Sequence, residues 1–255
     1  MANRDYVDVA SVPFRVATCD SAADEVLNLA RARVAQPVRL ANAYSLASAS
    51  KSPEYLRVMS GVGSTYPDGA PVVWFMRLFS GSRRPSRVRG PSLFRRVLDK
   101  SRDTGLRHMF VGATDETLTR LTKVIDDEYP GVKVGGAYAP PFEPVSDSFI
   151  DDIARAVCHH DCDLVWIGLG TPKQDLVAAL LAERVNAPCV GVGAAFDFVA
   201  GTVPEAPVLF QRLGLEWLYR FASEPRRLWR RYTIGNLRFL FAVARSKLNQ
   251  RAKVR

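Results

Sequence analysis

Residues 165–201 read VWIGLGTPKQDLVAALLAERVNAPCVGVGAAFDFVAG, and this stretch indicates the fold most clearly. Two apolar runs, residues 164–169 and 189–192, have the composition of buried strands, and each ends in a glycine-rich turn. Between them, residues 174–184 place their leucines on one face of a helix. Strand, turn, helix and strand in this order predict a βαβ unit. Its loops lie at the carboxyl ends of parallel strands, where open α/β sheets bind ligands.

The first glycine turn, residues 168–174, has features of an anion site. Pro172 suits the first turn of the following helix, and free backbone N–H groups together with Lys173 could bind an anion. The turn is not a Walker A loop, because no G-K-[ST] triplet follows it. Glycine turns after strands also occur as plain connections. The turns alone therefore leave a ligand role and a structural role open.

Strand-like and helix-like segments alternate through the first 200 residues. Ser21 is expected to cap a helix that runs to about residue 35, and Ser52 to cap another with Pro53 in its first turn. This alternation predicts an α/β fold with a mostly parallel sheet between two layers of helices. The remaining expected strands are 38–42, 107–112 and 132–135, the remaining helices are 93–102, 116–128 and 149–160, and the loops are 77–91 and 135–144.

Composition limits the class of protein. A chain of 255 residues with 47% hydrophobic residues can bury one sizeable core. Its four cysteines are too few for a disulfide framework, and they indicate reduced thiols in a cytosolic protein. The first residues resemble no signal peptide, and no window has the roughly 18 apolar residues of a membrane span. We expect a soluble protein or one that lies on a membrane surface.

The net charge of +9 is concentrated at the end of the chain. Residues 202–255 hold twelve Lys and Arg against three acidic residues, whereas residues 1–201 are neutral. We therefore divide the chain into a core, residues 1–201, and a basic appendage, residues 202–255, that follows a hinge at 201–207. The excess charge indicates an anionic partner, such as a phosphate-bearing substrate, an anionic membrane or a nucleic acid.

The appendage is predicted to be helical, over residues 211–222 and 225–250. Arg231, Arg238 and Arg245 recur every seven residues, so they share one helix face. An apolar face lies beside them, formed by Leu237, Leu240, Ala244 and Leu248. This pattern is typical of a basic amphipathic helix on an anionic membrane. It also fits a helix that packs on the core, and the pattern leaves both open.

Two short motifs look like metal sites but are better explained otherwise. The segment CHHDC, residues 158–162, reads as the end of a helix that enters a buried strand, where Cys is a common small hydrophobic residue. Asp161 and Asp163 form a DxD pair, but they precede a strand and so lie at the amino edge of the sheet, away from the ligand edge. We expect no metal site.

Several motifs occur together in an order that resembles one enzyme family. They are Asn42, PDG at residues 67–69, GLGTPKQD at 168–175, GVGAAFD at 191–197 with Gly201, AP at 206–207, GLEWLYR at 214–220, EPRR at 224–227 and RRY at 230–232. Together they resemble the WecG/TagA/CpsF family of bacterial glycosyltransferases over roughly residues 38–240. The resemblance implies a Rossmann-like catalytic core and a C-terminal appendage that closes on the site at the membrane.

The resemblance also implies a reaction. Family members carry out an inverting transfer of N-acetylmannosamine, its uronic acid or glucose from a UDP-sugar to a polyprenyl-diphosphate-linked sugar. Such a transfer needs a base for the acceptor hydroxyl and positive charge at the departing diphosphate. Asp68 matches the family's base, and arginines that supply the charge would make a metal cofactor unnecessary. The expected substrate-binding residues are Asn42, Gly69, Gly168, Gly170, Lys173, Gln174, Gly193, Phe196, Asp197, Arg220, Arg227 and Arg230.

Three positions depart from the family pattern. Leu40 stands where some members have Thr, Asp175 where Glu is usual, and Glu205 where Arg often precedes Ala-Pro. The first and third concern substrate contacts and not the reaction class. We expect the site to be complete only when the appendage docks, and deletion of 202–255 to leave a folded, inactive core. The enzyme would be peripheral on the cytoplasmic face of the bacterial plasma membrane.

The alternative is a non-catalytic protein that binds a nucleotide, or a nucleic acid through the basic tail. Against nucleic acid, the tail arginines alternate with a wide apolar and aromatic face, and the sequence holds no nucleic-acid recognition motif. We therefore expect no nucleic-acid partner.

Overall fold

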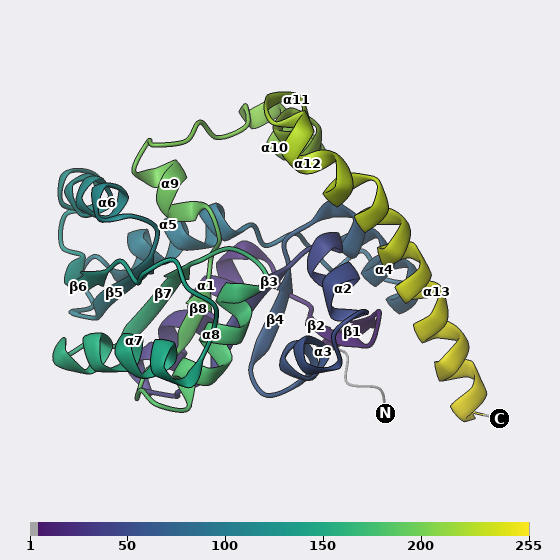
Figure 1. The fold of residues 1–255 in the computed structure, drawn as a ribbon, viewed down its shortest axis with the longest axis horizontal. Helices are drawn as coiled ribbons and strands as arrows, with labels where there is room; N and C mark the ends of the chain where they lie inside the picture. The colour runs from purple at the N-terminus through teal and green to yellow at the C-terminus, as the bar shows by residue number, and fades with distance from the viewer. Residues whose placement is uncertain (1–4, 255) are drawn as a thin grey trace.

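A computed structural model describes the backbone of residues 5–254 and the side chains of 5–226, 228–229 and 232–249. Its centre is a six-stranded parallel sheet in the order β4-β3-β8-β7-β5-β6 (Figure 1). The predicted α/β class with a Rossmann-like core is confirmed. The strands are β3 (Pro37–Ala41), β4 (Ser64–Pro67), β5 (Arg107–Gly112), β6 (Lys133–Tyr138), β7 (Leu164–Gly168) and β8 (Cys189–Gly191).

Alternation along the strands gives the sheet two buried faces. In β7, Leu164 and Trp166 point into one core, whereas Val165 and Ile167 point into the other. Helices cover both faces because most of the strand side chains there are apolar, although Arg39 and His108 are buried among them. The first face packs against α1 (Cys19–Arg31), α5 (Gly90–Ser101), α6 (Asp115–Glu128) and α9 (Ala195–Val199), and the second against α7 (Asp147–His159) and α8 (Lys173–Ala182).

A third hydrophobic cluster lies beside the β4 edge. It joins α2 (Ala43–Ala49), α3 (Pro53–Ser60) and α4 (Ala70–Ser80) to an antiparallel hairpin of β1 (Tyr6–Val9) and β2 (Val12–Arg15). This hairpin was not predicted from the sequence. Its two-residue loop has positive φ at both Ala10 and Ser11, the geometry of a tight hairpin turn, but without the Asn-Gly or Asp-Gly pair that usually marks it.

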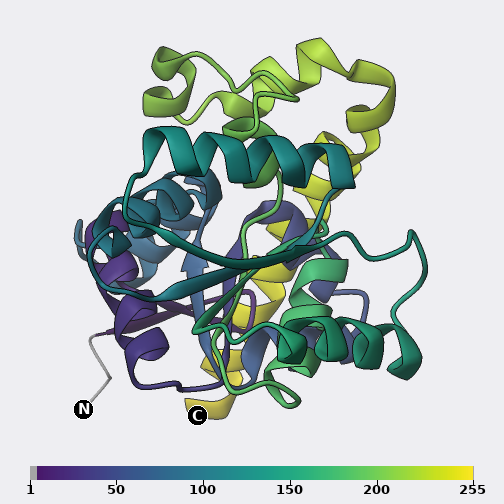
Figure 2. The ribbon, with the colours of Figure 1, turned by 90° about the vertical axis from the view of Figure 1, so that its left-hand side faces the viewer.

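The C-terminal segment has two parts (Figures 1 and 2). Three short helices, α10 (Val208–Leu213), α11 (Glu216–Ser223) and α12 (Pro225–Tyr232), stand beyond the carboxyl ends of β3 and β4. The long helix α13 (Ile234–Val254) then runs back along the core. Phe239 and Val243 of α13 are buried in the third cluster, and Ser11 of the hairpin loop donates to Ser246 at 3.2 Å.

This packing bears on two expectations for the appendage. One side of α13 does pack on the core, as one of the two readings of its pattern required. Deleting residues 202–255 would therefore expose the third cluster, so a well-folded truncated core is not what the structure supports. Among the described residues, no helix is both long and apolar enough to cross a bilayer.

Several predicted boundaries were wrong. The first helix begins at Cys19 and is capped by Thr18, whereas Ser21 is the third residue of the helix and completes the reciprocal capping box with Thr18. The expected loop at 77–91 is shorter, because α4 extends to Ser80 and α5 begins at Gly90. Strand β6 continues to Tyr138, into the expected loop at 135–144. Ser52 caps α3 with Pro53 in its first turn, as predicted.

Candidate active site

The site forms at the carboxyl edge of β3 and β4, at one end of the sheet. The chain passes from β3 outward to β4 on one side, while β8 lies on the other side of β3. Asn42 follows β3 directly and Asp68 follows β4 directly, so both stand at the carboxyl edge of adjacent strands. The carboxyl ends of parallel strands are where open α/β sheets bind ligands. The predicted base and the predicted asparagine are thus brought together.

Asn42 caps a helix as well as lining the site. Its Oδ1 accepts from the backbone N–H groups of Tyr44, at 3.0 Å, and Ser45, at 3.3 Å, and thereby caps α2. Since Oδ1 is engaged, Nδ2 is the part of the side chain that can donate to a substrate. Gly69 lets the two loops approach closely, because a Cβ there would lie 3.1 Å from the Cβ of Asn42.

Asp68 is held at the base of a cavity. Its backbone N–H donates to Ala41 at 2.9 Å, which continues the β3–β4 pairing, and its Oδ1 accepts from the backbone N–H of Gly90 at 3.3 Å. Burial raises the pKa of the Asp68 carboxyl, and the nearby Glu216 carboxylate raises it further. A carboxylate whose pKa is raised in this way is a stronger base than a solvated one.

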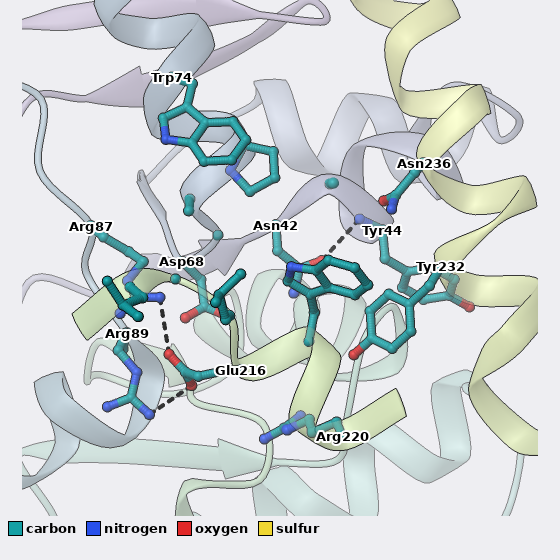
Figure 3. A pocket seen from close by; sticks show the side chains of 18 of the residues that line it. Asn42, Tyr44, Asp68, Trp74, Arg87, Arg89, Glu216, Arg220, Tyr232 and Asn236 are labelled. Carbon is teal, nitrogen blue, oxygen red and sulfur yellow. Dashed lines mark hydrogen bonds and ion pairs between the residues drawn. The ribbon is translucent and has the colours of Figure 1, made fainter. Parts of the chain in front are cut away.

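The core and the C-terminal helices enclose this cavity together (Figure 3). Its volume is about 390 Å³, and one wall comes from the segments after β3 and β4 while the opposite wall comes from α10 to α13. The lining residues are Asn42, Ala43, Tyr44, Asp68, Gly69, Ala70, Pro71, Trp74, Arg87, Arg89, Pro91, Leu213, Gly214, Leu215, Glu216, Trp217, Arg220, Tyr232 and Asn236.

Ion pairs fasten the two walls to each other. Glu216 of α11 pairs with Arg87 at 3.0 Å and with Arg89 at 2.8 Å (Figure 3). Arg89 also pairs with Glu205 at 2.6 Å and donates to the side chain of Gln211 at 2.7 Å. Glu205, the position where Arg often stands in the family pattern, is additionally paired with Arg95 at 2.9 Å. These pairs are largely buried, which makes removal of one partner costly.

Of the three predicted appendage arginines, Arg220 alone has a side chain among the described residues. Arg220 lines the cavity, and its guanidinium lies 5.0 Å from the ring centroid of Phe198 in α9, so it links α11 to the sheet side of the molecule. The side chains of Arg227 and Arg230 lie outside the described residues. Their expected contacts with a diphosphate therefore remain a prediction.

The residues predicted from the two glycine turns lie apart from this cavity. Gln174 is buried, and its Oε1 accepts from the backbone N–H of Gly193 at 2.9 Å, so it ties one turn to the other. Gly168 lies against the ring of Phe196, which is completely buried and packs on Phe94 and Phe110. Gln174 and Phe196 therefore hold the turns in place, and a substrate contact by either remains untested.

Three other turn residues have definite positions. Lys173 donates to the backbone carbonyl of Glu143 at 2.5 Å and lies 4.0 Å from the ring centroid of Phe149, away from the cavity around Asp68. Gly170 has φ of +74° with open space where a Cβ would stand. The Asp197 carboxylate accepts from Thr202 Oγ1 at 3.3 Å. A nucleotide site over these turns stays a prediction.

Several cavity residues were not predicted from the sequence. Arg87 and Arg89 fell within a segment expected to be a loop, and only their spacing of two, which places both on one side of an extended segment, could have signalled a shared role. Glu216 and Trp217 were part of a quoted motif but received no role. Tyr232 was likewise quoted without one. Folding brings these residues together from α4–α5, α11 and α12.

The carboxylates of the DxD pair are engaged at the opposite edge of the sheet. Arg33 pairs with Asp163 at 2.9 Å, and Arg107 forms a short ion pair with Asp161. In the described part of the chain, the pair thus joins the end of α1 to the start of β5. Its location agrees with the sequence argument that placed it away from the ligand edge.

Comparison with known proteins shows the family of the chain. Residues 7–253 match the glycosyl transferase WecG/TagA/CpsF family. The N-acetylglucosaminyldiphosphoundecaprenol N-acetyl-beta-D-mannosaminyltransferase of Bacillus spizizenii is 32% identical over 187 residues, which cover 72% of this chain and 69% of that protein. The protein of the same name from Bacillus subtilis is 30% identical over 188 residues, which cover 72% of this chain and 70% of the relative. The chain therefore belongs to the WecG/TagA/CpsF family and is a glycosyltransferase.

Proposed function

We propose that the protein transfers an N-acetylmannosaminyl group, with inversion, from a UDP-sugar to a polyprenyl-diphosphate-linked N-acetylglucosamine in cell-wall polymer synthesis. The names of the two Bacillus relatives support this sugar and this acceptor over the uronic acid and glucose that other family members use. The observation that carries the proposal is the half-buried Asp68, which shares a cavity with Arg220 at the carboxyl edge of the sheet.

Asp68 would act as the general base. As the acceptor hydroxyl oxygen forms its bond to the anomeric carbon, the hydroxyl proton moves to an Asp68 carboxylate oxygen. The bond between the anomeric carbon and the diphosphate oxygen breaks on the opposite face, and UDP leaves with the electron pair. Attack from the face opposite the leaving group inverts the configuration. The Nδ2 group of Asn42, which lines the same cavity, would orient a sugar hydroxyl.

The departing diphosphate needs positive charge. The charged side chains that line the cavity are Arg87, Arg89, Arg220, Asp68 and Glu216. Arg87 and Arg89 are already paired with Glu216. Arg220 is therefore the cavity arginine best placed to meet the leaving group, with Arg227 and Arg230 of α12 as the further candidates from the family resemblance. With arginines in this role, transfer would proceed without a metal ion, and activity should survive a chelator.

The nucleotide would lie along the carboxyl edge, over the turns that follow β7 and β8. The open space at Gly170 supports this placement, and a larger residue would close it. Gly168, Gly193 and Asp197 flank the same edge, and Gln174 holds the two turns together. The sugar would then reach toward Asp68 and Asn42 at the neighbouring strands.

We further propose that the exposed apolar side of the C-terminal helices rests on an anionic membrane. Its large hydrophobic side chains are exposed, although one side of α13 packs on the core. Basic residues such as Arg238 and Arg245 lie on the same helix, so acidic lipid headgroups would add attraction. The exposed residues of these helices are Val208, Leu209, Leu213, Trp217, Leu218, Trp229, Leu237, Leu240, Phe241 and Leu248, and Trp74 and Leu78 of α4 are exposed as well.

A panel experiment tests the proposed reaction. UDP release is measured from UDP-N-acetylmannosamine, its uronic acid and UDP-glucose, each with and without a short polyprenyl-diphosphate-N-acetylglucosamine in detergent. We expect acceptor-dependent release from UDP-N-acetylmannosamine, a β-linked product by NMR, and unchanged rates with EDTA. An α-linked product would refute inversion, and release from another donor alone would refute the sugar assignment.

A further inference from the structure

We infer that Glu216 is a positioning residue that sets the basicity of Asp68 when the C-terminal helices dock on the core. This inference rests on the proposed function, because it gives Glu216 a part in preparing the base of that reaction. Glu216 itself would contact neither the acceptor hydroxyl nor the anomeric carbon. It acts through its own negative charge and through the two arginines with which it pairs.

The geometry links Glu216 to Asp68 through a single segment of chain. Glu216 is the first residue of α11, and its two carboxylate oxygens accept from Arg87 at 3.0 Å and from Arg89 at 2.8 Å. Gly90, which follows Arg89 in the chain, donates its backbone N–H to Asp68 Oδ1. Figure 3 shows Glu216 and Asp68 beside Arg87, with Arg89 on the far side of Glu216. The arginines that hold the appendage are therefore neighbours of the base.

The charges around Asp68 explain what Glu216 contributes. Arg87, Arg89 and Arg220 all lower the pKa of the Asp68 carboxyl, and they face it from the α4–α5 segment and from α11. Burial raises that pKa, and Glu216 is the next largest influence in the same direction. The remaining titratable groups of the cavity are the phenols of Tyr44, on α2, and Tyr232, on α12. Glu216 is thus the one other carboxylate of the described cavity lining.

The arrangement couples docking to chemistry. Glu216 belongs to the appendage, whereas Asp68, Arg87 and Arg89 belong to the core. When α11 is docked, two of the arginines are neutralised by Glu216 and Asp68 stays a strong base. When α11 leaves, Arg87 loses its carboxylate partner and Arg89 keeps only Glu205, so more positive charge acts on Asp68. A carboxylate beside such charge is a weaker base. Sugar transfer would then be suppressed until the appendage closes.

A titration that requires no substrate tests this inference. The full chain is labelled with ¹³C at aspartate carboxyl groups, and the Asp68 signal is identified by its loss in Asp68→Asn. We expect Glu216→Gln to lower the Asp68 pKa measurably, because it removes the negative charge that raises that pKa. Arg87→Met breaks the same ion pair from the other side, and we expect it to raise the Asp68 pKa.

The two variants separate electrostatics from docking. Both weaken the attachment of α11, so an effect of lost docking would shift the Asp68 pKa in the same direction in each. Opposite shifts support the inference; shifts in the same direction, or no shift in Glu216→Gln, overturn it. The acid limb of the kcat/KM profile for Glu216→Gln should move to lower pH as well, and an unmoved limb counts against the inference.

The proposed function and this inference can fail separately. If the carboxyl titrations show the opposite shifts but Asp68→Asn transfers sugar normally, the coupling stands and the assignment of the base falls. If Asp68→Asn is inactive and the shifts are absent, the base stands and the role of Glu216 is refuted.

Discussion

Asp175 is a buried carboxyl whose environment makes stability depend on pH. It is fully buried at the start of α8, where Glu is usual in the family pattern, and its Oδ2 accepts from the Tyr55 hydroxyl at 2.5 Å. Among the described residues, its Oδ1 has no hydrogen-bond partner, nor has the buried Nε of Arg39. Burial raises the pKa of the Asp175 carboxyl to about 6. When Asp175 ionises, its carboxylate therefore carries a buried negative charge and accepts only one hydrogen bond, from Tyr55, among the described residues.

The size of the effect follows from the shift in pKa. The folded-state pKa is about 6 and the ordinary value is 3.8, so ionisation of Asp175 costs the folded state about 3 kcal/mol in total. Because the folded-state pKa is raised, the stability is fully present below pH 3.8 and is lost as the pH rises through about 6. About 1.4 kcal/mol of this loss falls between pH 5 and pH 8.

Urea unfolding of wild type and Asp175→Asn across this range measures the effect. Asparagine cannot ionise, so the free energy of unfolding of wild type relative to the variant should fall by about 1.4 kcal/mol from pH 5 to pH 8. Asp152→Asn, at an exposed position of α7, controls for the loss of one carboxylate. A difference between wild type and Asp175→Asn that stays constant with pH, or that grows in favour of wild type, would refute the reasoning.

Three further predictions concern packing, docking and the membrane. Gly168→Ala should lower the free energy of unfolding, measured in urea, by about 1–3 kcal/mol, because its Cβ would lie 2.6 Å from the Phe196 ring. An unchanged free energy of unfolding would contradict this close packing. Arg89→Met should speed proteolysis at residues 201–207, and a wild-type rate would show that its ion pairs do not hold the appendage. Phe241 is exposed, so Phe241→Ser should weaken sedimentation with anionic vesicles and leave Tm unchanged. Phe239 is buried, so Phe239→Ser should lower Tm. Unchanged vesicle binding by Phe241→Ser would contradict the membrane proposal.

Much of the fold could be predicted because strong local signals agree with the final packing. The segment 107–112 is a strand with the predicted bounds, since its apolar run is buried on both faces. Ser52 and Pro53 mark the start of α3 through capping chemistry that acts locally. The hairpin of β1 and β2 was missed because Ala10 and Ser11 adopt positive φ under the constraint of tertiary packing, including the contact with Ser246.

The site was predictable only where residues follow strand ends. Asn42 and Asp68 could be found because parallel strands present their carboxyl ends together. Arg87, Arg89 and Glu216 could not, because their meeting depends on how α11 docks, which no local pattern encodes. Phe196 and Gln174 carry motif signals that the structure explains in part by packing. A motif alone does not distinguish a side chain that contacts substrate from one that supports it.

The central claim is that Asp68 takes the proton of the acceptor. The most direct test compares the rate of sugar transfer by Asp68→Asn with that of wild type at saturating donor and acceptor, together with donor affinity by calorimetry. Asparagine keeps the shape of the side chain but cannot accept the proton, so we predict a loss of at least about 10²-fold in rate with donor affinity unchanged. Transfer by Asp68→Asn at a rate within about tenfold of wild type would contradict the account.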